Sequence, residues 1–327
     1  MGKDKKGWKI YGTIFLVTLL LVLVIRSFLI QSYTVSSSQM ETALLKGDRV
    51  LVDKTAYGIR MPVTLLSLPF TFDTFLGIRS YLDFIHLGYK RLFSSKVKKN
   101  DIVLFNNPLE TDKPIDKRSL ILSRCVAVPG DTIHVRGNDF YINNKKYIPS
   151  PDFLMTFKFP ANKKDSIVSI MESFDIPFRM VSSTDSVWEL ASLNRYESFI
   201  LNQKLPSSIE LKEDIKSDLY YELIVPSKGS EVKFNDLTAS LYNKIVQQED
   251  KDIIFKGNYF FKNDMLLDSY RFTDDYYWFV SDNPDGSTDS RSLGFISEKF
   301  VIGKAFYIWF NSYDGKINWD RCFSAVE

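Results

Sequence analysis

Residues 35–41 read VSSSQME, and the strand-like segment GDRVLV follows at residues 47–52. A run of small polar residues that ends at an apolar residue, here Met40, is typical of a loop that presents a reactive side chain. Gln39, the last residue of that run, carries no nucleophilic oxygen. The rest of the chain is best understood as a scaffold around this loop.

The composition excludes several classes of protein. The chain has 327 residues, 45% of them apolar and 15% aromatic, which is enough for one large core or two smaller ones. Its 42 basic and 40 acidic residues leave a formal charge of +2, so no nucleic-acid partner is expected. The two histidines, His86 and His134, stand apart from any cluster of carboxylates or cysteines. We therefore expect no metal, no cofactor and no Ser-His-Asp triad.

Cys125 and Cys322 lie far apart in the sequence. They could pair in an oxidising compartment, but a single cysteine in an apolar strand is more often a small core residue. The sequence leaves their pairing open.

An apolar run near the N-terminus predicts a membrane anchor. Residues 10–25 carry no charge, and the run extends past Arg26 to Ile30, about the 20 residues that a spanning helix needs. Residues 31–34 contain no small-x-small cleavage site, so we expect an uncleaved anchor over residues 1–31. The lysines at positions 3, 5, 6 and 9 predict a cytoplasmic N-terminus, with the remainder of the chain beyond the lipid bilayer.

Residues 57–93 are rich in leucine and phenylalanine, but prolines and charged residues interrupt every apolar window long enough for a second span. Two interpretations stay open for this segment. It is either a loop folded over the core or a patch that faces the membrane surface.

Short apolar segments separated by turns predict a mainly β fold, built from residues 32–150 and 251–327. We expect strands within residues 97–105, 120–133, 276–280 and 301–310. The Pro-Gly-Asp sequence at 129–131 predicts a turn, since proline fixes one φ and glycine frees the next. Two similar stretches, 137–143 and 257–263, indicate hairpins.

Residues 151–250 have a different sequence pattern and are expected to form an α+β insertion. The spacing of apolar residues favours a helix over 186–195, and Leu237, Leu241 and Ile245 predict another helix behind an N-cap at Asn235. The insertion contains no motif that carries chemistry.

Five segments in fixed order after a single anchor resemble the type I signal peptidase (leader peptidase) family. They span residues 25–28, 40–52, 101–105, 124–131 and 281–295. Members of that family are serine proteases of the bacterial inner membrane that cut signal peptides from exported proteins with a Ser/Lys dyad. The resemblance implies a coiled antiparallel β core on the extracytoplasmic side of the membrane.

Both dyad positions are substituted. The family serine precedes the methionine that matches Met40, which places it at Gln39, and the family lysine precedes the arginine that matches Arg124, which places it at Ser123. Nearby departures from the family pattern are Ser36, Ser38, Thr42, Ala43, Ser281 and Pro284. Glutamine cannot attack a carbonyl, and serine cannot act as the base, so a loss of about 10⁴- to 10⁶-fold in rate is expected.

Other positions keep the family residue. By the resemblance, Ser37 matches the hydroxyl that completes the oxyanion hole, Ser287 matches the hydroxyl that orients the lysine, and Asp289 and Arg291 match a supporting ion pair. A scaffold needs these last three residues even without the reaction. Ser38 is the alternative nucleophile, but a slip of one residue in extended backbone turns a side chain to the opposite face.

We therefore predict a non-catalytic homologue, a pseudoenzyme that receives an extended chain by strand addition. The expected partners are signal peptides of exported preproteins, an active signal peptidase or the export translocon. An active signal peptidase that uses Ser38 is the first alternative. A structural subunit of an envelope complex, with its binding groove filled by its own side chains, is the second.

Overall fold

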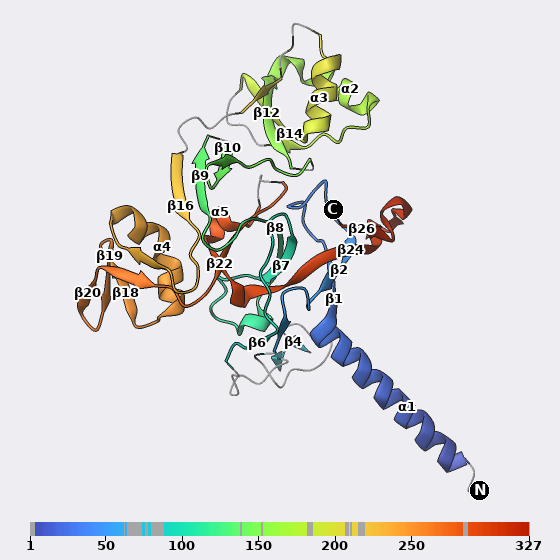
Figure 1. Cartoon of the computed structure of the whole chain (residues 1–327). Coiled ribbons are helices and arrows are strands. Elements are labelled where there is room, and N and C mark those ends of the chain that lie inside the picture. Colours follow the sequence, from blue (N-terminus) through green and yellow to red (C-terminus); the bar gives the residue numbers. More distant parts are fainter. Residues whose placement is uncertain are drawn as a thin grey trace.

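The computed structural model describes residues 4–61, 63, 74–75, 78–79, 88–137, 139–151, 153–181, 186–206, 209, 211–214, 220–283 and 287–326. The expected anchor is helix α1 (Asp4–Val24), which continues as a π-helical turn (Ile25–Leu29). Figure 1 shows α1 projecting away from the rest of the protein. Among the described residues, the window Trp8–Leu29 is the one helical stretch long and apolar enough to cross a membrane, and none of it is buried in the protein.

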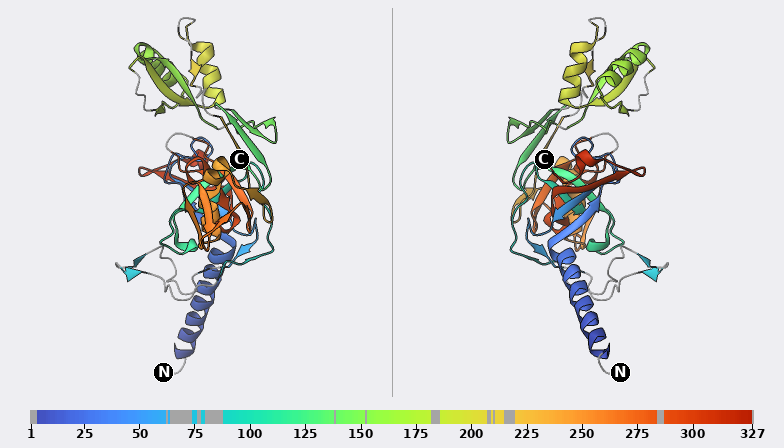
Figure 2. Two further views of the ribbon diagram at one scale, coloured as in Figure 1. Left: turned by 90° about the vertical axis from the view of Figure 1, so that its left-hand side faces the viewer. Right: turned by 90° about the vertical axis from the view of Figure 1, so that its right-hand side faces the viewer.

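The centre of the molecule is one curled antiparallel sheet, with strand order β1-β2-β24-β7-β8-β22-β23 (Figures 1 and 2). Its strands in this order are β1 (Ile30–Thr34), β2 (Asp48–Asp53), β24 (Val301–Tyr313), β7 (Ile102–Asn106), β8 (Leu120–Ala127), β22 (Tyr276–Val280) and β23 (Ile296–Ser297). The short strands β25 (Lys316–Ile317) and β26 (Ser324–Ala325) also pair with β24. The mainly β class is confirmed, and the strands expected from the sequence are present.

Strands β7 and β8 are buried on both faces, which explains why most of their residues are apolar and do not alternate with polar ones. Successive side chains of a strand point to opposite faces. Val103 and Phe105 therefore join one core cluster, and Ile102 and Leu104 join a second cluster that also contains Met40. Met40 thus fixes the loop of residues 35–41 to the sheet.

Cys125 lies on β8 and is fully buried in the first of these clusters. Both Cys125 and Cys322 are free thiols in the structure. Cys125 is accordingly the small core residue that its apolar surroundings predicted.

Two further sheets contain the predicted hairpins. Strands β9 (Thr132–Arg136), β10 (Asp139–Ile142), β11 (Lys145–Lys146) and β16 (Tyr220–Ile224) form one, and β18 (Ile253–Lys256), β19 (Tyr259–Lys262) and β20 (Met265–Leu267) form the other. Gly130, in the turn before β9, has φ +89°, and Gly257, between β18 and β19, has φ +58°. Glycine tolerates this left-handed region, so both turns follow directly from the sequence.

Helix α4 (Asp236–Glu249) begins behind the predicted N-cap, since the side chain of Asn235 accepts from the backbone of Leu237 and Thr238. Its buried face is Ala239, Tyr242, Ile245 and Val246, while Leu237 is 62% exposed. The predicted helix is therefore confirmed, with its buried stripe rotated from the predicted one. This face packs in one core cluster with the inner side of β22.

The described residues between 155 and 213 form an α+β unit with a core of its own, seen at the top of Figure 1. It contains α2 (Lys164–Ser173), α3 (Arg195–Lys204) and a sheet of order β13-β14-β12-β15, whose strands are β12 (Met155–Pro160), β13 (Met180–Val181), β14 (Trp188–Leu193) and β15 (Lys212–Glu213).

The helix predicted over residues 186–195 is wrong. Residues 188–193 are strand β14, which pairs with β12 on one side and β13 on the other. A central strand buries neighbouring residues on both faces, and this burial produced apolar spacing that resembles a helical period. The helix begins only at Arg195, where Asn194 and Glu197 form a capping box.

The remaining described elements are short. They are the strand pairs β3 (Ile59–Arg60) with β6 (Arg91–Leu92), β4 (Thr74–Phe75) with β5 (Ile78–Arg79) and β17 (Glu231–Lys233) with β21 (Ser269–Arg271), the helix α5 (Ser290–Leu293), and 3₁₀ turns at Ile115–Lys117, Ala161–Lys163, Glu298–Phe300 and Trp319–Arg321. Most of residues 62–87, where a loop or a membrane-facing patch was left open, lies outside the described residues.

Candidate functional site

The loop of residues 35–41 follows β1 and is held from both ends. The Val35 N–H donates to the Asp48 carbonyl at 2.8 Å, and the Gly47 N–H donates to the Val35 carbonyl at 2.9 Å. Gly47 has φ +91°, and a Cβ there would lie 2.6 Å from the Ser312 carbonyl oxygen, so only glycine fits. The loop therefore has one defined position beside the sheet.

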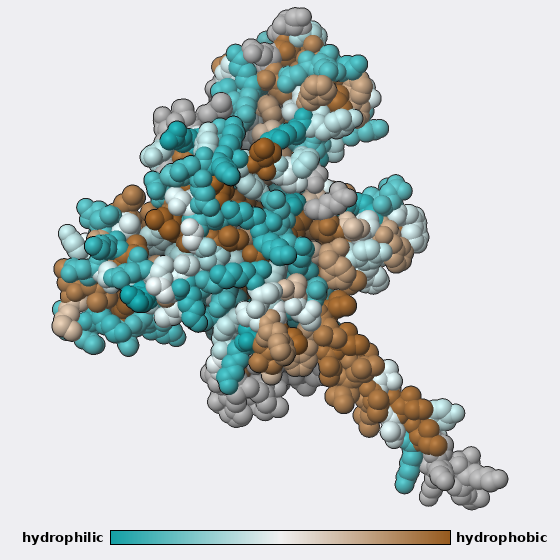
Figure 3. All heavy atoms as spheres, viewed as in Figure 1, coloured by the Kyte–Doolittle hydropathy of each residue, from teal (hydrophilic) through white to brown (hydrophobic). Residues whose placement is uncertain are grey.

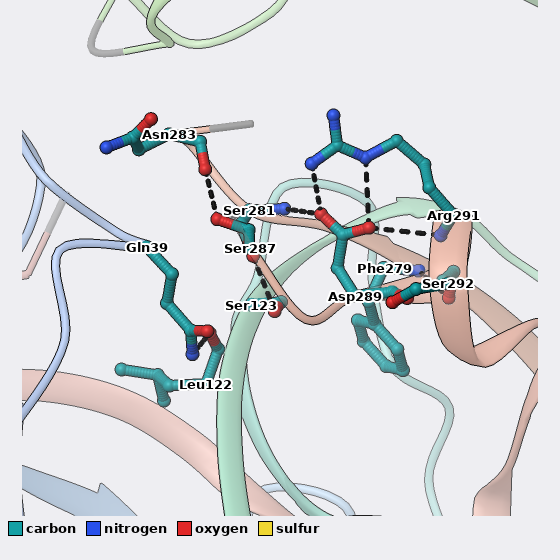
Figure 4. Close-up of polar contacts among 11 residues, drawn as sticks. Gln39, Leu122, Ser123, Phe279, Ser281, Asn283, Ser287, Asp289, Arg291 and Ser292 are labelled. Carbon is teal, nitrogen blue, oxygen red and sulfur yellow. Dashed lines mark hydrogen bonds and ion pairs between the residues drawn. The ribbon is translucent and has the colours of Figure 1, made fainter. Parts of the chain in front are cut away.

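Gln39 is half-buried and bonds to two segments of the scaffold, of which Figure 4 draws the contact with Leu122. Its side-chain Nε2 donates to the Leu122 carbonyl on β8 at 3.1 Å. Its own carbonyl accepts from the Asn283 N–H at 2.9 Å. The amide of Gln39 thus lies against β8, one residue before the position that matches the family lysine.

Ser123 is fully buried on β8, and its hydroxyl is 3.2 Å from the hydroxyl of Ser281. Ser281 stands where the resemblance places a glycine, and its backbone N–H donates to Asp289 Oδ2 at 2.9 Å. In the part of the chain that the structure describes, no lysine amine is hydrogen-bonded to Gln39, Ser123 or Ser281. These two serines and an amide supply no general base.

Ser287, Asp289 and Arg291 are brought together at the start of α5 (Figure 4). Asp289 is fully buried and forms a two-pronged ion pair with Arg291, at 3.0 Å from Nε and 2.6 Å from Nη2. The Ser287 hydroxyl donates to the Asn283 carbonyl. Ser287 is therefore directed at the backbone of its own loop.

Ser37 and Ser38 are both exposed, and the Ser38 carbonyl accepts from the Glu41 N–H at 2.9 Å. Thr42, where the family pattern has proline, adopts φ +90°. Proline is locked near φ −65°, so this loop has a conformation that a proline at residue 42 could not adopt.

Sequence reasoning missed the ion pair beside the two serines. Arg124 donates to both carboxylate oxygens of Asp282, at 2.8 and 2.7 Å, and the two side chains are only 5% and 2% exposed. The sequence contained a signal for this ion pair. Arg124 and Asp282 are single charged residues in or beside apolar strand segments, and each follows a substituted position, Ser123 or Ser281. A charge in a buried strand requires a partner, and these two have opposite signs.

Sequence reasoning also missed the contacts that β1 and the loop after it make with the edge of β8. Strand β1 ends the sheet, and β22 pairs with β8 only from Arg124 onward, so the edge of β8 over residues 120–123 is not covered by β22. The Leu120 carbonyl accepts from the Tyr33 hydroxyl at 3.4 Å, and the Leu122 carbonyl accepts from Gln39. Alternate carbonyls of a strand point to the same edge, so both contacts lie on that edge. We refer to β1 and this part of β8 as the open edges.

A third contact joins the insertion to the loop. Arg179 Nε donates to Glu41 Oε1 at 3.2 Å, and Arg179 Nη1 donates to both oxygens of Glu197 at 3.0 and 2.9 Å. The loop that ends at Met40 is thereby tied to the α+β unit as well as to the sheet.

A curled antiparallel sheet on one N-terminal apolar helix, with a loop after the first strand placed against β8, is the arrangement of a serine peptidase fold. The family profile described as "Signal peptidase, peptidase S26" matches residues 8–310. The chain belongs to this family. The segments that carried the resemblance lie in that matched range.

The names of individual relatives agree with this family assignment. The chain is 26% identical over 302 residues to "Signal peptidase I" of Buchnera aphidicola subsp. Acyrthosiphon pisum (strain APS), covering 92% of this chain and 74% of the relative. It is 24% identical over 306 residues to "Signal peptidase I" of Rickettsia bellii (strain OSU 85-389), covering 93% and 73%. With "Signal peptidase I" of Helicobacter pylori (strain J99 / ATCC 700824), it shares 23% identity over 326 residues, covering 95% and 90%.

Proposed function

We propose that this protein is a non-catalytic member of the signal peptidase I family. The observation that carries the proposal is the environment of Gln39 and Ser123. An amide bonded to the Leu122 carbonyl and a hydroxyl paired with Ser281 occupy the positions that correspond to the family dyad. Neither group can attack a carbonyl with the help of a neighbouring base.

The proposed activity is the binding of an extended segment of an exported preprotein at the open edges. A free strand edge presents backbone donors and acceptors that an added strand can pair with. The relatives are named signal peptidase I, which makes a signal peptide the first candidate for that strand. On binding, the added strand takes over the Leu122 carbonyl from Gln39.

A second candidate, a structural subunit of an envelope complex, is favoured by one observation. Tyr33 and Gln39 already satisfy two carbonyls on the open edge of β8, as an added strand would. In this alternative, Tyr33 and Gln39 stay bonded to β8 permanently, and the open edges bind no peptide.

Photocrosslinking separates the two candidates. The full-length protein in detergent is mixed with a preprotein that carries a photoreactive residue in its signal peptide, and crosslinked peptides are mapped. We expect crosslinks at residues 31–34 and 120–122, with a higher yield for Gln39→Ala, which frees the Leu122 carbonyl. Gln203→Ala, at an exposed position of α3, is the matched control and should leave the yield unchanged.

Absence of crosslinks in both the wild type and Gln39→Ala would overturn preprotein binding. A gentle membrane pull-down then distinguishes what remains. Recovery of an active signal peptidase or of the translocon would support a role as a partner of the export machinery, and recovery of other envelope proteins would support the structural subunit.

A further inference from the structure

The point where the anchor helix ends carries a lysine from a distant part of the sequence. The Lys54 N–H donates to the Leu29 carbonyl at 2.8 Å, and the Lys54 ammonium lies 2.6 Å from the Ser27 carbonyl and 3.4 Å from the Arg26 carbonyl. The last carbonyls of a helix attract positive charge, which explains this position. A lysine thus caps the end of the apolar span Trp8–Leu29.

More cations lie beside it. Arg60 on β3 donates to Asn106 Oδ1 at 2.9 Å and to the Lys299 carbonyl at 3.2 Å. Arg91 on β6 donates to the Val301 carbonyl. Within the described residues, the charged groups of Lys54 and Arg60 donate only to neutral oxygens. We refer to Arg26, Lys54 and Arg60 as the exit cluster.

The pKa values in the exit cluster reflect both burial and the mutual repulsion of its cations. Burial, followed by the charges of Arg60 and Arg26, lowers the pKa of Lys54 to about 8, and the opposing effect of Asp116 is smaller than any of these three. Burial and the charge of Arg91 lower the pKa of Arg60 to about 10. An anion placed among these groups would be stabilised by all of them.

The position of the exit cluster indicates which anion is available. The window Trp8–Leu29 has 22 residues, so as a helix it is about 33 Å long, close to the thickness of the hydrocarbon core. Its end would then lie at the depth of the lipid phosphates. Figure 3 shows the apolar surface of α1 continuing up to the body of the protein, where apolar and hydrophilic side chains are mixed.

We propose that the exit cluster binds the phosphate group of an anionic phospholipid. The Lys54 ammonium has three N–H bonds, two of them directed at the carbonyls of the anchor helix, and the third is available to a phosphate oxygen. The nearby guanidinium groups of Arg26 and Arg60 add positive charge around that donor. The bound lipid would fix the anchor against the β core at β2 and β3, and this role is independent of whether the open edges bind a peptide.

Native mass spectrometry of the full-length protein tests the proposal. Detergent-solubilised protein is titrated with phosphatidylglycerol, with phosphatidylcholine, and separately with inorganic phosphate. We expect phosphatidylglycerol to bind at least about tenfold more tightly than phosphatidylcholine, and Lys54→Gln to remove about that preference. Lys256→Gln, at an exposed position of β18, is the matched control and should bind as the wild type does.

Arg26→Gln provides a second variant, since Arg26 is exposed and lies on the anchor, outside the strands of the β core. We expect it to weaken phosphatidylglycerol binding as Lys54→Gln does. Equal binding of the two lipids, or full binding by both variants, would overturn the proposal. If inorganic phosphate binds as tightly as phosphatidylglycerol, the site recognises free phosphate and the proposal of a phospholipid ligand is overturned.

Discussion

The Gln39 side-chain amide donates to the carbonyl of Leu122 at 3.1 Å, and Leu122 immediately precedes Ser123. The two positions that the resemblance assigns to the family nucleophile and base therefore lie beside each other in the fold. By that assignment, an amide and a buried hydroxyl stand where the family has a hydroxyl and an amine. The scaffold that aligns them is retained.

Reverting the dyad should require three substitutions. Ser123 is fully buried with its hydroxyl 3.2 Å from that of Ser281, so a lysine at residue 123 would collide with the Ser281 side chain. We expect Gln39→Ser/Ser123→Lys/Ser281→Gly to cleave a preprotein at least roughly tenfold faster than Gln39→Ser/Ser123→Lys, a difference of about 1.4 kcal/mol in the barrier. Single-turnover cleavage rates provide the measurement.

Gln39→Ala/Ser123→Lys/Ser281→Gly is the matched control, because it has the lysine and the space but no nucleophile. It should show no cleavage. Equal rates for the double and triple variants would contradict the steric role assigned to Ser281.

The buried ion pair between Arg124 and Asp282 should be essential for stability. Arg124→Met leaves the carboxylate of Asp282 buried without its bidentate partner, and we expect a loss of about 3–5 kcal/mol in the free energy of unfolding. Lys146→Met breaks an ion pair of similar length with Asp139, but those side chains are 59% and 45% exposed, so its effect should be small. Denaturant unfolding compares the two variants, and equal losses would contradict the burial argument.

The contact between Arg179 and Glu41 should restrict the motion of the loop. Glu41→Gln removes one charge of this pair and leaves the pair of Arg179 with Glu197 intact. We expect faster amide hydrogen exchange over residues 36–46, with the exchange of α2 and α3 unchanged, because the α+β unit has its own core. Lys164→Gln, which breaks a pair inside that unit, is the control. Unchanged exchange in the loop would show that the insertion does not hold it.

The lowered pKa of Lys54 predicts a dependence of stability on pH. Between about pH 8 and pH 10.5 the unfolded chain binds more protons at this lysine than the folded protein does, so folding becomes more favourable as the pH rises. Below pH 8 both states are protonated and the difference is constant. In lipid-free detergent the wild type should gain up to about 3 kcal/mol over this window relative to Lys54→Met.

Groups other than Lys54 titrate in both the wild type and Lys54→Met, so their contributions to the free energy of unfolding largely cancel in the difference between the two. Lys256→Met is the control, since an exposed lysine should show no such gain. A difference between the wild type and Lys54→Met that is independent of pH would contradict the assigned burial.

The sequence predicted the parts of the fold that depend on local patterns. The turn residues at 129–131 and the cap at Asn235 were sufficient to predict the turn before β9 and the start of α4. The strand β14 was mistaken for a helix, because it is held in a strand by pairing with β12 and β13 at its two edges, and the local sequence does not contain these partners.

The residues of the candidate site were predicted from the family resemblance and not from local patterns. The order of the five matching segments located Gln39 and Ser123. The partners of these two residues could not be predicted, because they depend on pairings between distant strands. The Arg124–Asp282 ion pair joins residues 158 positions apart, and the contact of Tyr33 with the Leu120 carbonyl spans 87. Only the three-dimensional register of β1, β8 and β22 brings them together.

The central claim is that the retained site does not cleave. The most direct measurement is incubation of the purified full-length protein with a labelled preprotein, followed by detection of the mature product. We expect no cleavage by the wild type and unchanged behaviour of Ser38→Ala. A mature product that forms with the wild type and disappears with Ser38→Ala would contradict the claim and identify an active signal peptidase with a displaced nucleophile.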